Sequence, residues 1–175
     1  MKKIFVNKGS IAALLLISVN STTLAADDGF YMGLNLGWAG EESKQGEVLP
    51  TFDTSKANGL GTRFAFGYQM NKFFAIDSGA YYYMDDFLQG DVQRGLDLSA
   101  KGILPFMEGF NAFAKLGASY VVEDDEWELV PLYGAGLGYD LNASWTVEAS
   151  WTRLIGNGSA SDSNFLSGGV AYHFG

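Results

Sequence analysis

The side chains best suited to catalysis are scarce in this chain of 175 residues. It has no cysteine, which excludes a disulfide scaffold, a thiolate metal site and a cysteine nucleophile. Its single histidine is His173, close to the C-terminal end. A serine nucleophile needs a base beside it, and no serine lies two positions after His173, as a histidine-x-serine pattern would require. We therefore predict no catalytic residue, no cofactor and no metal centre.

Charged side chains occur singly in segments that are otherwise apolar or rich in small residues. Three bases and three acids form a candidate ion network, a balance that suits pairing: Arg63, Asp77, Asp97, Lys101, Lys115 and Glu148. If these groups are buried they must pair, because an unpaired buried charge costs about 3–5 kcal/mol. Such pairs would either control a narrow ion path or fill an enclosed space with salt bridges and water.

The densest charge cluster is the acidic run Glu123, Asp124, Asp125 and Glu126, followed by Trp127. Carboxylates of this kind bind divalent cations, which would bridge to anionic phosphates. The run lacks the glycine-punctuated spacing of a calcium loop, so a solvated acidic loop is the alternative interpretation.

Strict alternation predicts the elements that position these charges. Apolar residues at every second position from Phe30 to Trp38 are separated by small or polar ones, and the pattern returns from Leu60 to Tyr68. Successive side chains of a strand point to opposite faces, so each strand has one apolar face and one small or polar face. The charged residues lie on the small and polar face, together with Gln69 and His173. A ligand-binding soluble barrel would have an apolar interior, whereas a barrel in lipid is apolar outside and polar within.

The sequence predicts eight strands with alternating connection lengths. We expect them over 29–38, 58–69, 73–83, 92–104, 110–122, 129–141, 144–154 and 165–174. Short connections are expected at 70–72, 105–109 and 142–143, and long ones at 39–57, 84–91, 122–128 and 155–164. Short turns at one end and long loops at the other are typical of outer-membrane barrels. The predicted fold is all-β, an eight-stranded antiparallel up-and-down transmembrane β-barrel whose closure leaves no unpaired edge.

Aromatic residues gather near the strand ends and are predicted to form two interfacial girdles. They are Trp38, Tyr68, Phe73, Phe74, Tyr81, Tyr82, Tyr83, Trp145, Trp151, Tyr172 and Phe174. The alternative is that these aromatics fill the core of a soluble barrel.

The first 25 residues resemble a secretory signal, and 26–175 then form the barrel domain. Lysines precede the apolar run over 11–19, which is too short to span a bilayer as a helix, and small residues follow near Ala25. An N-terminal membrane anchor is the alternative. Cleavage would remove three of the 11 basic residues and none of the 20 acidic ones, which changes the net charge from −9 to −12. This charge argues against nucleic acid or a heparin-type polyanion as a partner.

The stretches at 64–71, 98–106, 113–120, 134–141 and 165–175 together resemble the OmpA-like transmembrane domain, including its OmpX-like and opacity-type relatives. The resemblance implies an interior ion-pair network to which Asp77, Lys101 and Glu148 contribute. The family's interior acid on the sixth strand falls near Gly138, and its interior arginine on the seventh falls near Thr146. The resemblance also implies that the outer-membrane assembly machinery reads a closing strand that ends in an aromatic residue, and Phe174 is penultimate here.

We therefore expect a monomeric barrel of the cell outer membrane with a structural or surface-interaction role, or alternatively low-conductance pore activity. Expected partners are outer-membrane lipids and lipopolysaccharide, the assembly machinery, and host or phage surface ligands. A surface adhesin or immune-evasion protein that acts through external loops is another alternative. A lipid A-modifying enzyme is the least favoured, because no base and nucleophile occur together.

Overall fold

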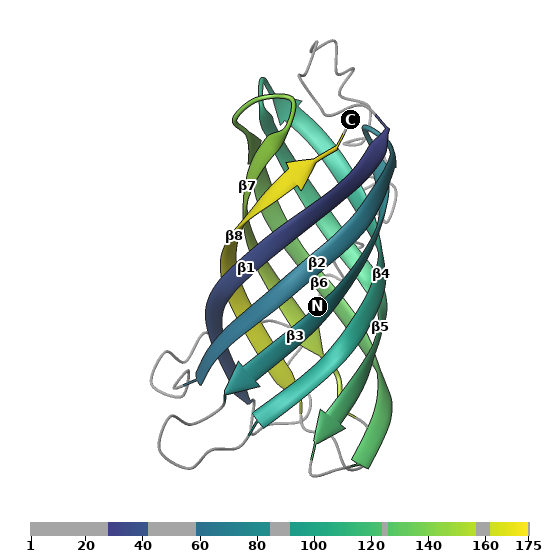
Figure 1. The fold of residues 1–175 in the computed structure, drawn as a ribbon, viewed down its shortest axis with the longest axis vertical. Helices are drawn as coiled ribbons and strands as arrows, with labels where there is room; N and C mark the ends of the chain where they lie inside the picture. The colour runs from purple at the N-terminus through teal and green to yellow at the C-terminus, as the bar shows by residue number, and fades with distance from the viewer. Residues whose placement is uncertain (1–27, 42–58, 85–91, 124–125, 157–161, 175) are drawn as a thin grey trace, which may run out of the picture.

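Eight antiparallel strands close into a barrel (Figure 1). The computed structural model describes residues 28–41, 59–84, 92–123, 126–156 and 162–174. The strands are β1 (Gly29–Glu41), β2 (Gly59–Asn71), β3 (Phe74–Met84), β4 (Val92–Met107), β5 (Phe110–Glu123), β6 (Glu126–Asp140), β7 (Trp145–Leu154) and β8 (Ser163–His173). Each strand pairs with the next, and β8 pairs back onto β1, so no strand edge is left open. The predicted fold class is confirmed.

The observed strands match the predicted ones to within three residues at every end, but two predicted connections are wrong. The connection expected over 105–109 is shorter, because β4 continues through Pro105 to Met107 with a register shift between these two residues. Proline cannot donate to the ladder, and an irregularity of this kind is where a strand tolerates it. The long loop expected over 122–128 is also wrong, because Glu123 and Glu126 are directly opposite each other as the last paired residues of β5 and β6.

The β2–β3, β4–β5 and β6–β7 turns lie at one end of the barrel, which we call the short-turn end. The side chain of Asn71 accepts hydrogen bonds from the backbone N–H groups of Phe73 and Phe74, at 2.8 and 3.1 Å. Asn142 does the same for the N–H groups of Ser144 and Trp145, at 2.9 and 3.0 Å. An asparagine side chain that bonds its own backbone two residues on stabilises a tight reversal. The β4–β5 turn uses Gly109, whose φ of 76° favours glycine.

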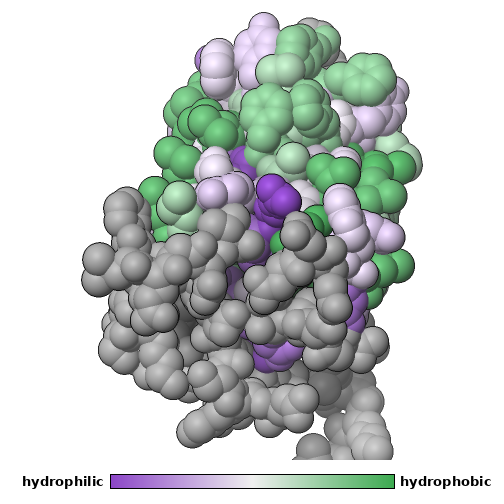
Figure 2. All heavy atoms as spheres, turned by 60° about the horizontal axis from the view of Figure 1, so that its bottom comes forward, coloured by the Kyte–Doolittle hydropathy of each residue, from purple (hydrophilic) through white to green (hydrophobic). Residues whose placement is uncertain are grey.

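The outward face of the barrel is apolar and the inward face is largely polar, the reverse of a soluble barrel. Phe30, Trp38 and Leu116 have 68, 62 and 70 % of their surfaces exposed, whereas Asn35, Ser119 and Asp77 are buried. Figure 2 shows mainly hydrophobic residues over the visible part of the outer wall. Such a surface is stable only where lipid covers it, so the arrangement favours the transmembrane barrel over the soluble one.

Inside, the end opposite the short turns (the long-loop end) contains a packed apolar layer. Eight buried side chains from six strands form this apolar layer: Ala39, Tyr81, Tyr83, Val121, Val130, Leu132, Leu154 and Phe165. The prediction that Tyr81 and Tyr83 belong to the interfacial girdles is therefore wrong. Both lie an even number of residues from Asp77 on β3, so their side chains share its inward face.

Candidate functional site in the barrel interior

The alternation of each strand directs the charged side chains into the barrel. Arg63 on β2, Asp77 on β3 and Lys115 on β5 are all less than 10 % exposed. Their outward neighbours are apolar or small, for example Phe64, Ile76, Ser78, Ala114 and Leu116. An eight-stranded barrel is only wide enough for its inward side chains, so these groups contact one another across the lumen.

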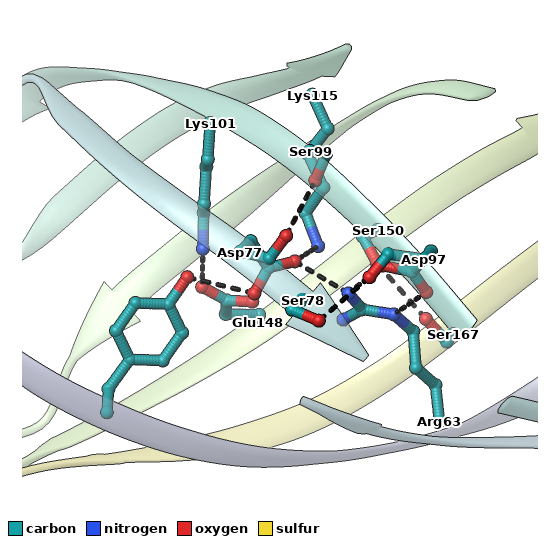
Figure 3. Close-up of polar contacts among 11 residues, drawn as sticks. Arg63, Asp77, Ser78, Asp97, Ser99, Lys101, Lys115, Glu148, Ser150 and Ser167 are labelled. Atoms are coloured by element: carbon teal, nitrogen blue, oxygen red, sulfur yellow. Dashed lines mark hydrogen bonds and ion pairs between the residues drawn. The ribbon is translucent and has the colours of Figure 1, made fainter. Parts of the chain in front are cut away.

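Asp77 is the centre of the arrangement (Figure 3). It is 1 % exposed, and its carboxylate accepts hydrogen bonds from three different strands. Arg63 Nη2 donates at 2.8 Å, Lys115 Nζ at 2.9 Å and the Tyr31 hydroxyl at 2.9 Å. A carboxylate with this many charge-assisted donors is held in a single orientation.

Arg63 joins Asp77 to a second carboxylate. Its Nε donates to one oxygen of Asp97 at 2.8 Å, and its Nη2 donates to the other at 2.6 Å. This two-point contact matches the planar geometry of guanidinium and carboxylate. Arg63, Lys115, Asp77 and Asp97 therefore form a central cluster with two positive and two negative charges.

Lys101 and Glu148 form a separate pair nearer the short-turn end. The lysine ammonium donates to the Glu148 carboxylate. It also lies 4.1 Å from the ring centroid of Phe113 and 5.7 Å from that of Tyr31, distances suited to cation–π attraction. Gly138 is directly opposite Glu148 in the ladder and provides no acid there. In the described part of the interior, Lys101 has one carboxylate partner.

Glycine provides the space for the central cluster. A Cβ atom added at Gly79 would lie 2.6 Å from Arg63 Nε and 2.7 Å from its Cζ. Gly79 pairs with Asp97 in the ladder between β3 and β4, so the guanidinium passes over this glycine to reach its carboxylate. Any larger residue at this position would displace Arg63 from its partners.

The apolar layer covers the central cluster on the side of the long-loop end. The rings of Tyr81 and Tyr83 stack with centroids 4.6 Å apart, and Tyr83 lies 4.6 Å from Phe165 on β8. The Tyr81 hydroxyl lies 2.7 Å from the Ser119 hydroxyl, and these groups form the boundary between the apolar layer and the polar groups below it. The lumen therefore contains a neutral ionic section and an apolar section in series.

The short-turn end holds a cavity that is open at its mouth and is lined by both polar and apolar side chains. Lys101, Glu148 and Asn111 are among the residues that line it, together with His173. Thr146 Oγ1 donates to Asp140 at 2.7 Å and lies 3.2 Å from His173 Nε2. The described residues contain no group of three or more histidines, cysteines or acids that could hold a metal ion. The part of the chain that the structure describes has no helix that is long and apolar enough to cross a membrane.

Six other aromatic residues predicted for the interfaces lie at the two ends of the barrel. Trp38, Tyr82 and Trp151 are near the long-loop end, where the Trp151 indole donates to Asn164 at 3.1 Å. Trp145, Tyr172 and Phe174 are near the short-turn end, where their rings pack in sequence with centroids 5.0 and 4.9 Å apart.

The acidic run remains a prediction. Asp124 and Asp125 lie outside the described residues, and Glu123 and Glu126 are the end residues of β5 and β6.

Sequence reasoning missed two members of the polar interior and one ion pair at the rim. Tyr31 and Ser119 lie on the small-residue face of their strands, so alternation alone could have identified them. Arg153 binds Asp162 at 3.2 Å near the end of β7. No periodic signal marks this pair, because Asp162 precedes β8 rather than lying within a strand.

Comparison with known proteins agrees with this architecture. An uncharacterized protein of Coxiella burnetii is 25 % identical over 208 aligned positions, which cover 85 % of this chain and 83 % of that protein. Neisserial surface protein A matches with a TM-score of 0.53 and 20 % identity, covering 83 % of this chain and 97 % of that one. Ail of Yersinia pestis matches with a TM-score of 0.53 and 14 % identity, covering 86 and 99 %. The β-barrel domain of OprF from Pseudomonas aeruginosa gives 0.54 and 14 %, covering 85 and 100 %. These structural likenesses show the fold.

The family described as "Outer membrane protein beta-barrel domain" matches residues 10–174, nearly the whole chain. Together with the closed barrel and its apolar outer wall, this match confirms the predicted resemblance and the cell outer membrane as the location. The chain belongs to the outer membrane protein β-barrel domain family.

Proposed function

We propose that this protein is a structural barrel of the outer membrane whose lumen does not conduct ions. The main support for this proposal is the apolar layer. Four of its side chains come from four different strands and are at most 4 % exposed: Tyr83, Val121, Val130 and Phe165. Family membership alone leaves open whether the role is structural, porin-like or adhesive. The packing of this interior favours the structural role.

The physical argument concerns the desolvation of an ion in transit. An ion that enters from the short-turn end reaches Lys101 and Glu148 and then the central cluster, whose charges already neutralise one another. Beyond them it would meet the stacked rings of the apolar layer, which provide no ligand to replace its water shell. A hydrophobic constriction of this kind blocks conduction even without a charged barrier.

We further propose that the protein is not an enzyme. His173 is the only histidine of the chain, and the hydroxyl within hydrogen-bond distance of its ring, at 3.2 Å from Nε2, belongs to Thr146 rather than to a serine. Thr146 donates to Asp140, so its proton is already engaged. Among the residues that the structure describes, His173 has no ordered nucleophile beside it of the kind that acyl transfer requires.

We also propose lipid contact over the whole outer wall, a monomeric state, and assembly by the outer-membrane machinery. Closure pairs every strand, which leaves no edge to recruit a second copy. One structure of Ail holds the heparin analogue sucrose octasulfate. The net charge of −9 opposes an equivalent polyanion interaction for this chain. The adhesin hypothesis remains a prediction because residues 42–58 lie outside the described residues.

The test is planar-bilayer current measured on detergent-folded protein, with an unboiled and a boiled sample run on the same gel. We expect a migration shift between the two gel samples, which reports a folded barrel, and no discrete current steps. Reproducible steps from a sample that shows the shift would overturn the structural proposal in favour of the pore. No shift would mean that the sample is unfolded, and refolding would precede the current measurement.

A further inference from the structure

On the described part of the outer wall, charged residues are rare and all of them are basic. Among the described outward positions of the eight strands, the charged residues are Arg94 on β4 and Arg153 on β7. The whole chain carries 20 acidic and 11 basic residues, yet no carboxylate occupies a described outward strand position. Both arginines lie near the long-loop end of their strands. At this end, the described outward positions of the strands therefore carry positive charge and no carboxylate.

The two arginines differ in their surroundings. Arg153 is 5 % exposed and pairs with Asp162 at 3.2 Å. Arg94 is exposed, and in the described part of the structure no carboxylate lies within ion-pair distance of it. Arg94 is thus a guanidinium whose donors are available to a ligand outside the barrel.

Aromatic side chains flank Arg94 on both sides. Tyr82 is directly opposite it on β3, and Val122 is opposite it on β5. Val122 in turn is opposite Trp127 on β6, whose ring lies 5.5 Å from that of Tyr120. Tyr82, Tyr120 and Trp127 are 39, 47 and 63 % exposed. Amphipathic rings of this kind are typical of the level where acyl chains meet headgroups, so Arg94 lies at headgroup depth.

We propose that Arg94, between Tyr82 and the Tyr120–Trp127 pair, binds a phosphate of lipid A in the outer leaflet. A guanidinium donates two parallel hydrogen bonds to a phosphate, and the neighbouring rings pack against the sugar and acyl portions of the same molecule. The long-loop end of such barrels faces the cell exterior, the side on which this glycolipid is found. The absence of outward carboxylates removes the repulsion that a phosphorylated headgroup would otherwise meet. This inference does not depend on whether the lumen conducts.

The experiment is native mass spectrometry of the folded protein released from detergent micelles that contain a defined lipid. Three lipids are compared at equal concentration: bis-phosphorylated lipid A, the same lipid A after removal of its phosphates, and phosphatidylglycerol. We expect retention of the bis-phosphorylated form to exceed that of the dephosphorylated form about tenfold, the loss expected for one charge-assisted contact. Equal retention of the two forms would overturn the phosphate assignment, and equal retention of phosphatidylglycerol would overturn the assignment to lipid A.

Variants then locate the site. Arg94→Gln is expected to lower retention of bis-phosphorylated lipid A to the level of the dephosphorylated form. The matched control is Lys72→Gln, which removes an exposed cation from the β2–β3 turn at the opposite end of the barrel and leaves retention unchanged. If Arg94→Gln retains as much bis-phosphorylated lipid A as the unmodified protein does, Arg94 is not the binding site. The gel shift on boiling establishes that each variant is folded, and the comparison of lipids on the unmodified protein remains decisive if one is not.

Discussion

At the scale of single residues, Asp77 joins the two cations of the central cluster, because its carboxylate binds both Arg63 and Lys115. It balances Arg63 and Lys115 at 2.8 and 2.9 Å, and its replacement would leave both cations facing a single remaining carboxylate, Asp97. We predict that Asp77→Asn lowers the free energy of unfolding by about 3–5 kcal/mol, the usual cost of breaking a buried pair. The measurement is a urea titration in lipid vesicles followed by the folded band on unboiled gels. Asp28→Asn, which changes an exposed carboxylate just before β1, is expected to leave the midpoint in place.

Lys101 permits a sharper test of pairing, because its partner can be neutralised separately. Lys101→Ala leaves Glu148 as an uncompensated charge inside the barrel and is predicted to lower thermal stability by about 3 kcal/mol. Adding Glu148→Gln removes the remaining charge and is expected to restore part of that loss. The exposed Lys72→Ala is the control. An unchanged unfolding transition for Lys101→Ala, or no recovery in the double variant, would contradict the pairing.

Alternation predicted which residues point inward but could not predict which acid pairs with which base. The partners of Asp77 come from β1, β2 and β5, and their meeting depends on the stagger of all the intervening strands. Tyr83 shows the opposite limitation. Its position near a strand end suggested the membrane interface, although its parity with Asp77 placed it inside. Where position along the strand and parity disagree, parity decides, because side chains of a strand strictly alternate.

At the scale of elements, the Arg63 guanidinium can reach Asp97 only because a glycine, Gly79, stands on the inward face of β3 between them. A methyl group at Gly79 would meet the Arg63 guanidinium at 2.6 Å, whereas one at the neighbouring-strand position Gly102 would meet nothing within 4 Å. We predict that Gly79→Ala lowers the urea midpoint, because Arg63 must leave Asp97 or β3 must shift. Gly102→Ala, which points outward, is expected to be neutral or slightly stabilising because glycine weakens a strand. Equal midpoints for the two variants would show that the interior tolerates the added volume.

The alternation of apolar residues predicted where most strands begin and end. It failed where backbone pairing continues through residues that usually end a strand. Pro105 was expected to end its strand, but its neighbours continue the ladder with an irregularity at that point. Similarly, the acidic run suggested a long loop, whereas Glu123 and Glu126 remain in register. In both cases the neighbouring strand offers a partner for the extra residues, so the ladder continues. Pairing between two strands cannot be predicted from the sequence of one of them.

At the scale of the whole molecule, the closed lumen has two barriers in series, and each is expected to block ions without the other. Arg63→Gln with Asp97→Asn removes one charge of each sign from the central cluster and leaves Lys115 paired with Asp77. Tyr83→Ala with Phe165→Ala opens the middle of the apolar layer. We predict that neither pair of substitutions alone produces current steps in planar bilayers, because the remaining layer still has no continuous water path. Combining all four is predicted to produce small steps, since an ion would then meet polar groups and water along the lumen.

The control for this series is Leu96→Ala with Leu98→Ala, which removes comparable volume from the lipid-facing side of β4 and is expected to remain silent. Each variant must first show the gel shift on boiling, so that an absence of current reports a closed barrel rather than an unfolded one. Steps from the Tyr83 and Phe165 variant alone would mean that the paired charges form no barrier and that the apolar layer alone closes the lumen. Silence of the fourfold variant would mean that the remaining side chains collapse into the space, as the narrow lumen of eight strands permits.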